Sequence, residues 1–308
     1  MDPIFRDARK FLPQHDVDVV VYHSPCNDGH ASAALFYDHI NDLTFHGLHP
    51  KDALLTPDVC ALIKGKNVVF VDIAFSRDTM LEVAKLANRV LVLDHHVTNE
   101  TCLKSLNVDN MLCIFQMDVP GVFLSWMYLY ARPVSEMPTA LYYIGLKDVW
   151  KHKDNKAAVY FMTAFERPDT WDGWLPYIRD ESLVPYTIDH GMKISVYNDS
   201  VLKTMMEKVQ YAKWRGYTIA MVNVPYPWIS DIGALMCERD PENTIAVIWN
   251  KQMTGPYHVS LRTHNPRGPN VEVIAHEFNG GGHVHGAGLR LNRPPFEVFV
   301  ENVKDAPE

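Results

Sequence analysis

The sequence lacks the features of secreted and membrane proteins. Its five cysteines are odd in number and scattered without any C-x-x-C pair, which argues against a disulfide framework and against a thiolate zinc site. No uninterrupted apolar run reaches the roughly eighteen residues of a membrane span. The first residues, MDPIFRDARKFLPQHD, mix both charge signs without the apolar block of a secretory signal. We therefore expect a soluble, cytoplasmic protein with no membrane partner.

The sequence also has fewer basic than acidic residues. The chain has 29 Lys and Arg against 37 Asp and Glu, a formal net charge of −8. Such a balance repels a long phosphodiester backbone, and we find no run of Lys or Arg that outweighs it locally. Any nucleic-acid substrate should therefore be short, and a long duplex is not expected as a partner. The sequence leaves open whether two chains pair as a homodimer.

The 308 residues exceed the size at which one hydrophobic core usually keeps growing, so we expect two domains. The first half alternates short apolar runs with segments of helical period, which is typical of a mostly parallel sheet. The clearest predicted strands are 17–23, 66–72 and 88–94, and the predicted helices are 30–40, 76–88, 121–130 and 138–150. The predicted fold class is therefore α/β, with an N-terminal mostly parallel sheet flanked by helices.

The second half has a different pattern. Residues 152–187 are irregular and aromatic, and helical period returns over 195–214, which we interpret as a connector helix. A smaller C-terminal α/β domain should follow. Its predicted elements are strands near 217–224, 244–250 and 257–263 and helices near 230–238 and 270–278.

Acidic and imidazole side chains recur where the predicted strands end. The carboxyl ends of parallel strands line one crevice, where ligands of such folds bind. The residues concerned are His23 and Asp28 after the first strand, Asp72 after the second, Asp94, His95 and His96 after the third, and Asp148 at the end of a helix.

Carboxylates gathered in one cleft repel one another unless cations neutralise them. Mixed Asp and His ligation suits Mn²⁺ and is compatible with Mg²⁺ or Co²⁺, and the absence of thiolates argues against zinc. A single strand-terminal Asp is more often a helix N-cap, and a His pair is more often one buried and one solvated ring. The prediction of a metal centre therefore depends on the recurrence across three strands.

With these blocks the sequence resembles the DHH phosphoesterase family, named for a triplet that matches Asp94, His95 and His96. YHSPCNDGHASAA, VFVDIAFS and GLKDVW resemble its other blocks in the expected order. The tail, from VSLRTHNPRG to VIAHEFNGGGHVHGAG, resembles the DHH-associated C-terminal domain with its GGGH motif. The resemblance implies a DHH catalytic metal-binding domain over 1–190, a helical linker over 191–215 and a substrate-binding domain over 216–308.

The resemblance also implies two divalent ions, usually Mn²⁺. By that correspondence, His23, Asp28 and Asp72 hold the first ion, and Asp72, His95 and Asp148 hold the second, with Asp72 as the bridge. Asp72 and His96 are the implied catalytic residues, since His96 would face the substrate phosphate as an electrostatic stabiliser or a proton donor to the leaving oxygen.

The first block departs from the family pattern. Asp28 follows His23 by five residues, and His30 stands where a second Asp is usual. Our hypothesis is that His30 supplies a nitrogen ligand in its place. The alternative is a histidine at a helix start that faces water.

Gly280, Gly281, Gly282 and His283 form the predicted phosphate-binding loop, because glycines let a phosphate approach the backbone N–H groups. Arg262, on a predicted strand, offers a planar fork that matches phosphate. Taken alone, the glycines are more often a helix C-cap and a flexible loop. The aromatic stretch 171–177 could stack a base, but such residues more often just pack.

We expect a metal-dependent phosphoesterase that hydrolyses short oligonucleotides or small dinucleotides through water activated by two metal ions. One alternative is a pyrophosphatase or exopolyphosphatase, although relatives with that activity typically lack the GGGH motif. The other alternative is a non-catalytic nucleotide sensor, in which the altered first block has cost the second ion.

Overall fold

The computed structural model describes residues 3–52 and 54–301. The chain divides into two compact units, Met1–Ser195 and Val196–Glu308. The expected fold class is confirmed, since a parallel sheet flanked by helices is followed by a second, smaller sheet domain. The roles predicted for the two domains stay predictions.

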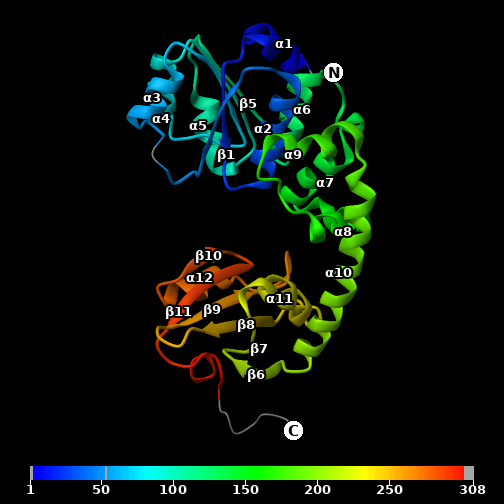
Figure 1. Ribbon diagram of the computed structural model, residues 1–308. Helices are drawn as coiled ribbons and strands as arrows, with labels where there is room; N and C mark the ends of the chain where they lie inside the picture. Colours follow the sequence, from blue (N-terminus) through cyan, green and yellow to red (C-terminus); the bar gives the residue numbers. More distant parts are fainter. Residues whose placement is uncertain (1–2, 53, 302–308) are drawn as a thin grey trace. The chain divides into compact units, whose positions relative to one another are not determined.

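The first unit is built on five parallel strands in the order β2-β1-β3-β4-β5. The strands are β1 (Val19–His23), β2 (Thr44–Leu48), β3 (Asn67–Val71), β4 (Arg89–Asp94) and β5 (Met111–Phe115). The central strands are near-continuous runs of branched apolar residues, as expected for a sheet that is covered on both faces. Because all five strands run the same way, their carboxyl ends lie at one edge (Figure 1).

Helices cover both faces of this sheet. Those of the unit are α1 (Pro3–Phe11), α2 (Asn27–His39), α3 (Pro57–Ile63), α4 (Arg77–Leu86), α5 (Val97–Ser105), α6 (Gly121–Tyr130), α7 (Thr139–Asp148), α8 (Lys156–Ala164), α9 (Trp171–Leu175) and α10 (Leu183–Met206). In the described part of the chain, no helix is both long and apolar enough to cross a membrane.

Alternate residues of each strand enter two separate cores, as the two-residue period of a strand requires. Val69 and Val71 of β3 pack with α1, α2, α6 and α7 on one face. Val68 and Phe70 pack with α3 and α4 on the other. The sheet is therefore held from both sides, and its carboxyl edge has a rigid support.

The second half of the chain differs from the sequence-based expectation in two places. The segment 152–187, expected to be irregular, contains α8, α9 and the start of α10. The connector helix, expected over 195–214, is α10 and ends at Met206, and residues Gln210–Trp214 form strand β6 instead. The boundary between the two units falls within α10.

The second unit is a six-stranded sheet in the order β10-β11-β9-β8-β7-β6, in which only β7 and β8 are parallel. Its strands are β6, β7 (Tyr217–Asn223), β8 (Thr244–Lys251), β9 (Tyr257–Arg262), β10 (Gly281–His283) and β11 (Gly286–Leu291). Helix α12 (Val271–Glu277) packs on one face with Val247 and Leu261. Helix α11 (Ile229–Cys237) packs on the other face with Ala246 and Ile248.

Candidate metal centre and substrate-binding face

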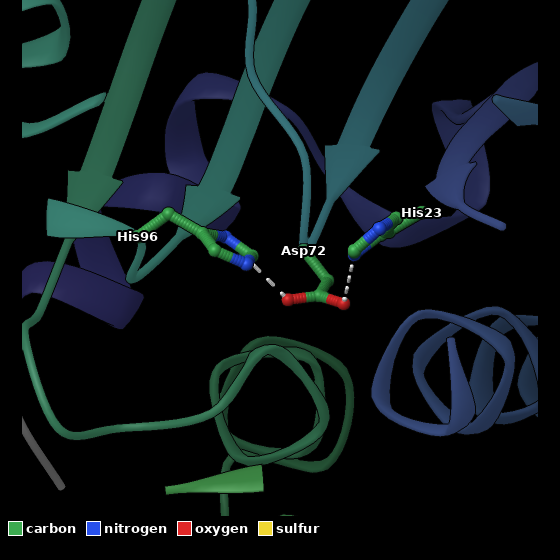
Figure 2. Close-up of side chains that lie close together, drawn as sticks. All are labelled: His23, Asp72 and His96. Carbon is green, nitrogen blue, oxygen red and sulfur yellow. Dashed lines mark hydrogen bonds and ion pairs between the residues drawn. The ribbon is translucent and has the colours of Figure 1, made fainter. Parts of the chain in front are cut away.

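The carboxyl edge of the first sheet gathers the side chains that the sequence pattern singled out. His23 is the last residue of β1, Asp72 follows β3, and Asp94 ends β4. Figure 2 shows Asp72 between the imidazole rings of His23 and His96, just beyond the strand ends. Helices α2 and α7 bring Asp28 and Asp148 to the same edge.

Six of these residues form two groups whose potential ligand atoms lie within 4.8 Å of one another. The first group is His23, Asp72 and His96, and the second is Asp28, His95 and Asp148.

Asp72 belongs to the first group and also contacts the second. Its Oδ2 is 3.2 Å from His23 Nδ1, and its Oδ1 is 3.1 Å from His95 Nε2. In the second group, His95 Nε2 is 3.2 Å from Asp148 Oδ2 and 4.0 Å from Asp28 Oδ2. The two groups therefore form one continuous cluster with Asp72 at its centre.

The local backbone is shaped to hold this cluster. Asp72 has a left-handed conformation with φ of 59°, which is uncommon outside Gly, Asn and Asp. Gly121, the first residue of α6, has no space for a side chain, because a Cβ there would lie 2.7 Å from Asp72 Cβ and 2.9 Å from Asp28 Oδ2. The sequence analysis did not identify Gly121 as a site residue.

The N-terminus of α6 holds the carboxylate of Asp28. The N–H groups of Gly121 and Val122 donate to its two oxygens at 2.6 and 3.1 Å. The first N–H groups of a helix have no partner within the helix and carry partial positive charge, so they stabilise an anion. Asp28 is nevertheless fully buried.

Burial and neighbouring charges shift the pKa values of the carboxylates in the cluster. Burial, followed by the charges of Asp72 and Asp148, raises the pKa of Asp28 well above its usual value. Burial and Asp72 likewise raise the pKa of Asp148. Although burial acts against it, the hydrogen bonds with His23 and His95 lower the pKa of Asp72. Burial and mutual repulsion thus disfavour the ionised forms of Asp28 and Asp148.

These residues fit divalent cations. Carboxylate oxygens and imidazole nitrogens without thiolates suit Mn²⁺, Mg²⁺ or Co²⁺. Cations at the cluster would also relieve the repulsion among Asp28, Asp72 and Asp148.

The grouping of ligand atoms differs from the two sets that the family resemblance implied. His96 lies with His23 and Asp72, whereas Asp28 lies with His95 and Asp148. Strand order places side chains at one edge but does not say which atoms meet, so the sequence could not separate these arrangements. The assignment of each residue to an ion stays a prediction.

His30 is outside both groups. Its Nδ1 lies 2.8 Å from the carbonyl oxygen of Cys26, and its ring packs edge-on against Tyr22 at 4.9 Å. The hypothesis that His30 replaces the missing Asp as a ligand therefore gains no support from the positions of the side chains. Trp171 lies in the same aromatic cluster, 5.5 Å from Tyr22.

Asp94 orients His96. It is fully buried, and its two oxygens accept hydrogen bonds from His96 Nδ1 at 2.8 Å and Asn99 Nδ2 at 2.7 Å. The hydrogen bond with Asp94 raises the pKa of His96 to about 9 against the effect of burial. A carboxylate that fixes the orientation of a neighbouring imidazole is common around metal centres.

The Asp94–His96 pair should make the stability of the metal-free protein depend on pH. A histidine with a raised pKa stabilises the fold fully below its ordinary pKa of 6.5, and the contribution is lost as pH rises through about 9. The full shift equals about 3 kcal/mol, but solvent screening reduces this to about 1 kcal/mol, because the side chain is 37% exposed. Urea unfolding in EDTA should show this loss between these pH values.

The control for this prediction is Asp94→Asn, which removes the main cause of the raised pKa. Its stability should fall less steeply with rising pH than that of the unmodified protein. The contributions of Asp28 and Asp148 are common to both proteins. Equal pH dependence in the two would show that Asp94 does not hold the proton on His96.

The predicted substrate-binding residues of the second unit share one face of its sheet. Arg262 of β9 is paired with Gly286 of β11, which is paired with His283 of β10. Directly paired residues point to the same side of a sheet. Because neighbouring strands lie about 4.8 Å apart, the Cα atoms of His283 and Arg262 are about 10 Å apart, with Gly286 between them. Gly286 has no side chain, and the position that a Cβ would take there lies 3.4 Å from Arg262 Nη1, so the guanidinium extends over Gly286.

The three glycines before His283 have different structural roles. A Cβ at Gly280 would lie 2.3 Å from the carbonyl oxygen of Gly288, and one at Gly282, which has φ of 151°, would lie 2.6 Å from Ala287 Cα. These two glycines are therefore required by the close approach of β11. A Cβ at Gly281 would meet only His276, at 3.9 Å, so this position is open to a ligand.

A cavity of about 760 Å³ lies within the second unit. It includes Gly280, and its other lining residues include Ser260, Gly288 and Arg290, which lie on the same side of the sheet as Arg262 and Gly286. Sequence analysis missed this cavity, because it depends on the register of strands that are far apart along the chain.

Comparison with known proteins supports the fold. No family model matches the chain. It is 26% identical over 294 residues to the uncharacterised protein R106 of Acanthamoeba polyphaga mimivirus, covering 90% of this chain and 68% of the relative.

Two solved structures have similar folds. The DHH domain of a member of the S1p family of ribosomal proteins has a TM-score of 0.53 at 12% identity, over 96% of this chain and 88% of that one. The pGpG-specific phosphodiesterase PggH from Vibrio cholerae has a TM-score of 0.50 at 12% identity, over 90% of this chain and 93% of that one. The chain therefore has the fold of DHH-domain proteins.

Proposed function

We propose that this protein is a DHH-type, divalent-metal-dependent phosphoesterase that hydrolyses phosphoester bonds of short oligonucleotides or small dinucleotides. The observation that carries this proposal is the buried cluster in which Asp72 contacts His23 and His95 at 3.2 and 3.1 Å. A fold shared with a phosphodiesterase that acts on pGpG is consistent with a nucleotide substrate.

The two groups of the cluster would each hold one cation. His23, Asp72 and His96 would hold one, and Asp28, His95 and Asp148 the other. Bound divalent ions supply a nucleophilic hydroxide at neutral pH and neutralise charge on the phosphoryl oxygens. The N–H groups of Gly121 and Val122 favour the ionised form of Asp28 against the burial that raises its pKa, and a bound cation would favour that form further.

His96 has two candidate roles. Its Nδ1 is engaged by Asp94 at 2.8 Å, which keeps a proton on the ring and leaves Nε2 as the nitrogen that can face a substrate oxygen. A protonated imidazole there could stabilise the phosphate or donate to the leaving oxygen. As a ligand it would have to be neutral, so the two roles exclude each other.

The second unit would bind the substrate. Arg262 and His283 lie on either side of Gly286 on one face of the sheet, and the Arg262 guanidinium extends over Gly286, where it could bind a phosphate. A cavity of about 760 Å³ on the same unit is large enough for a nucleoside. These features favour a nucleotide over inorganic pyrophosphate.

A substrate panel tests the proposal. Dinucleotides, trinucleotides, longer single strands, cyclic dinucleotides and pyrophosphate are incubated with Mn²⁺ or Mg²⁺, and the products are separated by ion-exchange chromatography. We expect hydrolysis of the short substrates and a steep decline beyond a few nucleotides, because the net charge of −8 repels long strands. Equal rates on a long single strand would overturn the restriction to short substrates.

The same panel separates the alternatives. Orthophosphate release from pyrophosphate without cleavage of dinucleotides would indicate a pyrophosphatase. Dinucleotide binding without turnover of any substrate, together with one ion per chain by elemental analysis, would indicate a nucleotide sensor.

A further inference from the structure

The segment that follows Asp148 presents an exposed tryptophan. Trp150 has 66% of its surface accessible, although large aromatic side chains usually bury most of theirs. Its backbone is left-handed, with φ of 58° and ψ of 16°. Such a conformation is costly for a bulky residue and is concentrated at functional sites. The position is therefore held in place by its surroundings at some cost in stability.

Two lysines lie near the ring of Trp150. Lys147 Nζ and Lys153 Nζ lie 5.1 and 5.7 Å from the ring centroid, within the range of a cation–π contact. Residues 147–156 contain four lysines and two aspartates. The segment is thus locally positive in a chain whose net charge is −8, contrary to our expectation that no run of Lys or Arg outweighs the negative charge locally.

This segment lies at the edge of the sheet that carries the metal centre. Asp148, a member of the cluster, precedes Trp150 by two residues. Lys151 Nζ lies 3.4 Å from the carbonyl oxygen of Asp118. Asp118 belongs to the loop that leads into Gly121, whose N–H group donates to Asp28. The segment is therefore linked to the cluster in two ways, through Asp148 in the chain and through the contact of Lys151 with the loop before Gly121.

We propose that Trp150 is a stacking platform for a nucleobase of the substrate, and that the flanking lysines contact its phosphates. This inference rests on the proposed function, since it names the substrate of that centre as a base-bearing single strand. An exposed aromatic ring among cations is the combination that single-strand binding proteins use, because every base offers a π-face and every linkage a negative charge. Inorganic pyrophosphate has no group that could use the ring.

The test is equilibrium binding by the full-length chain in EDTA, so that no hydrolysis occurs. Isothermal titration calorimetry compares a tetranucleotide with a tetramer of abasic deoxyribose phosphates. We expect Trp150→Ala to weaken tetranucleotide binding about tenfold or more, which is the usual effect of removing one stacking partner. The abasic tetramer should show no such effect. Trp150→Phe should restore most of the affinity.

Two controls make the result specific. Tyr186, which is 67% exposed, is a matched aromatic residue on α10, and Tyr186→Ala should leave tetranucleotide binding unchanged. Quenching of tryptophan fluorescence by the tetranucleotide should be smaller in Trp150→Phe than in the unmodified protein. Circular dichroism melting curves show whether each variant is folded.

Equal tetranucleotide affinity of Trp150→Ala and the unmodified protein would overturn the inference, as would equal weakening for the abasic tetramer. A different experimental result would show that the proposed function is wrong. If the unmodified protein with Mn²⁺ fails to hydrolyse bis(4-nitrophenyl) phosphate and every member of the substrate panel, the phosphoesterase assignment falls, whatever Trp150 binds.

Discussion

Replacing Asp72 with Asn should lower kcat/KM for bis(4-nitrophenyl) phosphate in Mn²⁺ by about a thousandfold or more, which corresponds to the several kcal/mol that metal activation supplies. Asp72 is fully buried and contacts both His23 and His95, so the amide removes one negative charge from the centre of the cluster. Elemental analysis should find fewer than two Mn²⁺ ions per chain.

The substitution should change the chemistry without unfolding the protein. Asp72 has φ of 59°, and Asn is one of the few residues that adopt a left-handed backbone readily. Asp42 provides a matched control, since it has φ of 60° and lies outside both ligand groups. Asp42→Asn should keep full activity. A loss below tenfold in Asp72→Asn would contradict a bridging role for this carboxylate.

The convergence of the candidate ligand residues at one edge could be predicted from the sequence because one rule of topology applies to the residues that follow the strands. Parallel strands end at one edge, so side chains that follow β1, β3 and β4 must lie near one another. The atomic grouping depends on rotamers and on helix positions that no local pattern encodes. The contact of Asp28 with the start of α6, for example, joins residues 93 positions apart.

One missed element is a local strand pair that follows a helical pattern in the sequence. Strand β6 continues the helical period of α10, but Gln210–Trp214 pairs with β7 instead. The hairpin turns at Arg215 and Gly216, which have φ of 49° and 82°. Two positive φ values are typical of a tight hairpin turn, and Asn-Gly is its usual sequence. Arg-Gly gives a weaker signal of the same turn.

The predicted substrate-binding face depends on strand register, which the sequence pattern does not give. The GGGH motif indicates a glycine loop, yet Gly280 and Gly282 are needed for packing against β11. Gly286 lies between Arg262 and His283 only because three strands pair in one register. Sequence spacing alone does not contain that register.

Removal of the Arg262 guanidinium should lower kcat/KM for a dinucleotide by about 10 to 100-fold, the range expected for a hydrogen bond to a charged group. Arg262 is half-buried, and burial lowers the pKa of its guanidinium. One of its N–H groups donates to the carbonyl oxygen of Leu261 at 2.9 Å, which orients the planar group. A Cβ at Gly286 would lie 3.4 Å from its Nη1, so the guanidinium extends over Gly286.

Comparison of two substitutions separates charge from geometry. Arg262→Lys keeps the charge but loses the two-pronged donor geometry, so it should recover only part of the activity lost in Arg262→Ala. Arg293→Ala, at an exposed arginine two residues beyond β11, is the control and should leave kcat/KM unchanged. Because the second unit would bind substrate and the first would cleave it, the loss should appear mainly in KM. A loss in kcat with KM unchanged would instead place Arg262 in the cleavage step.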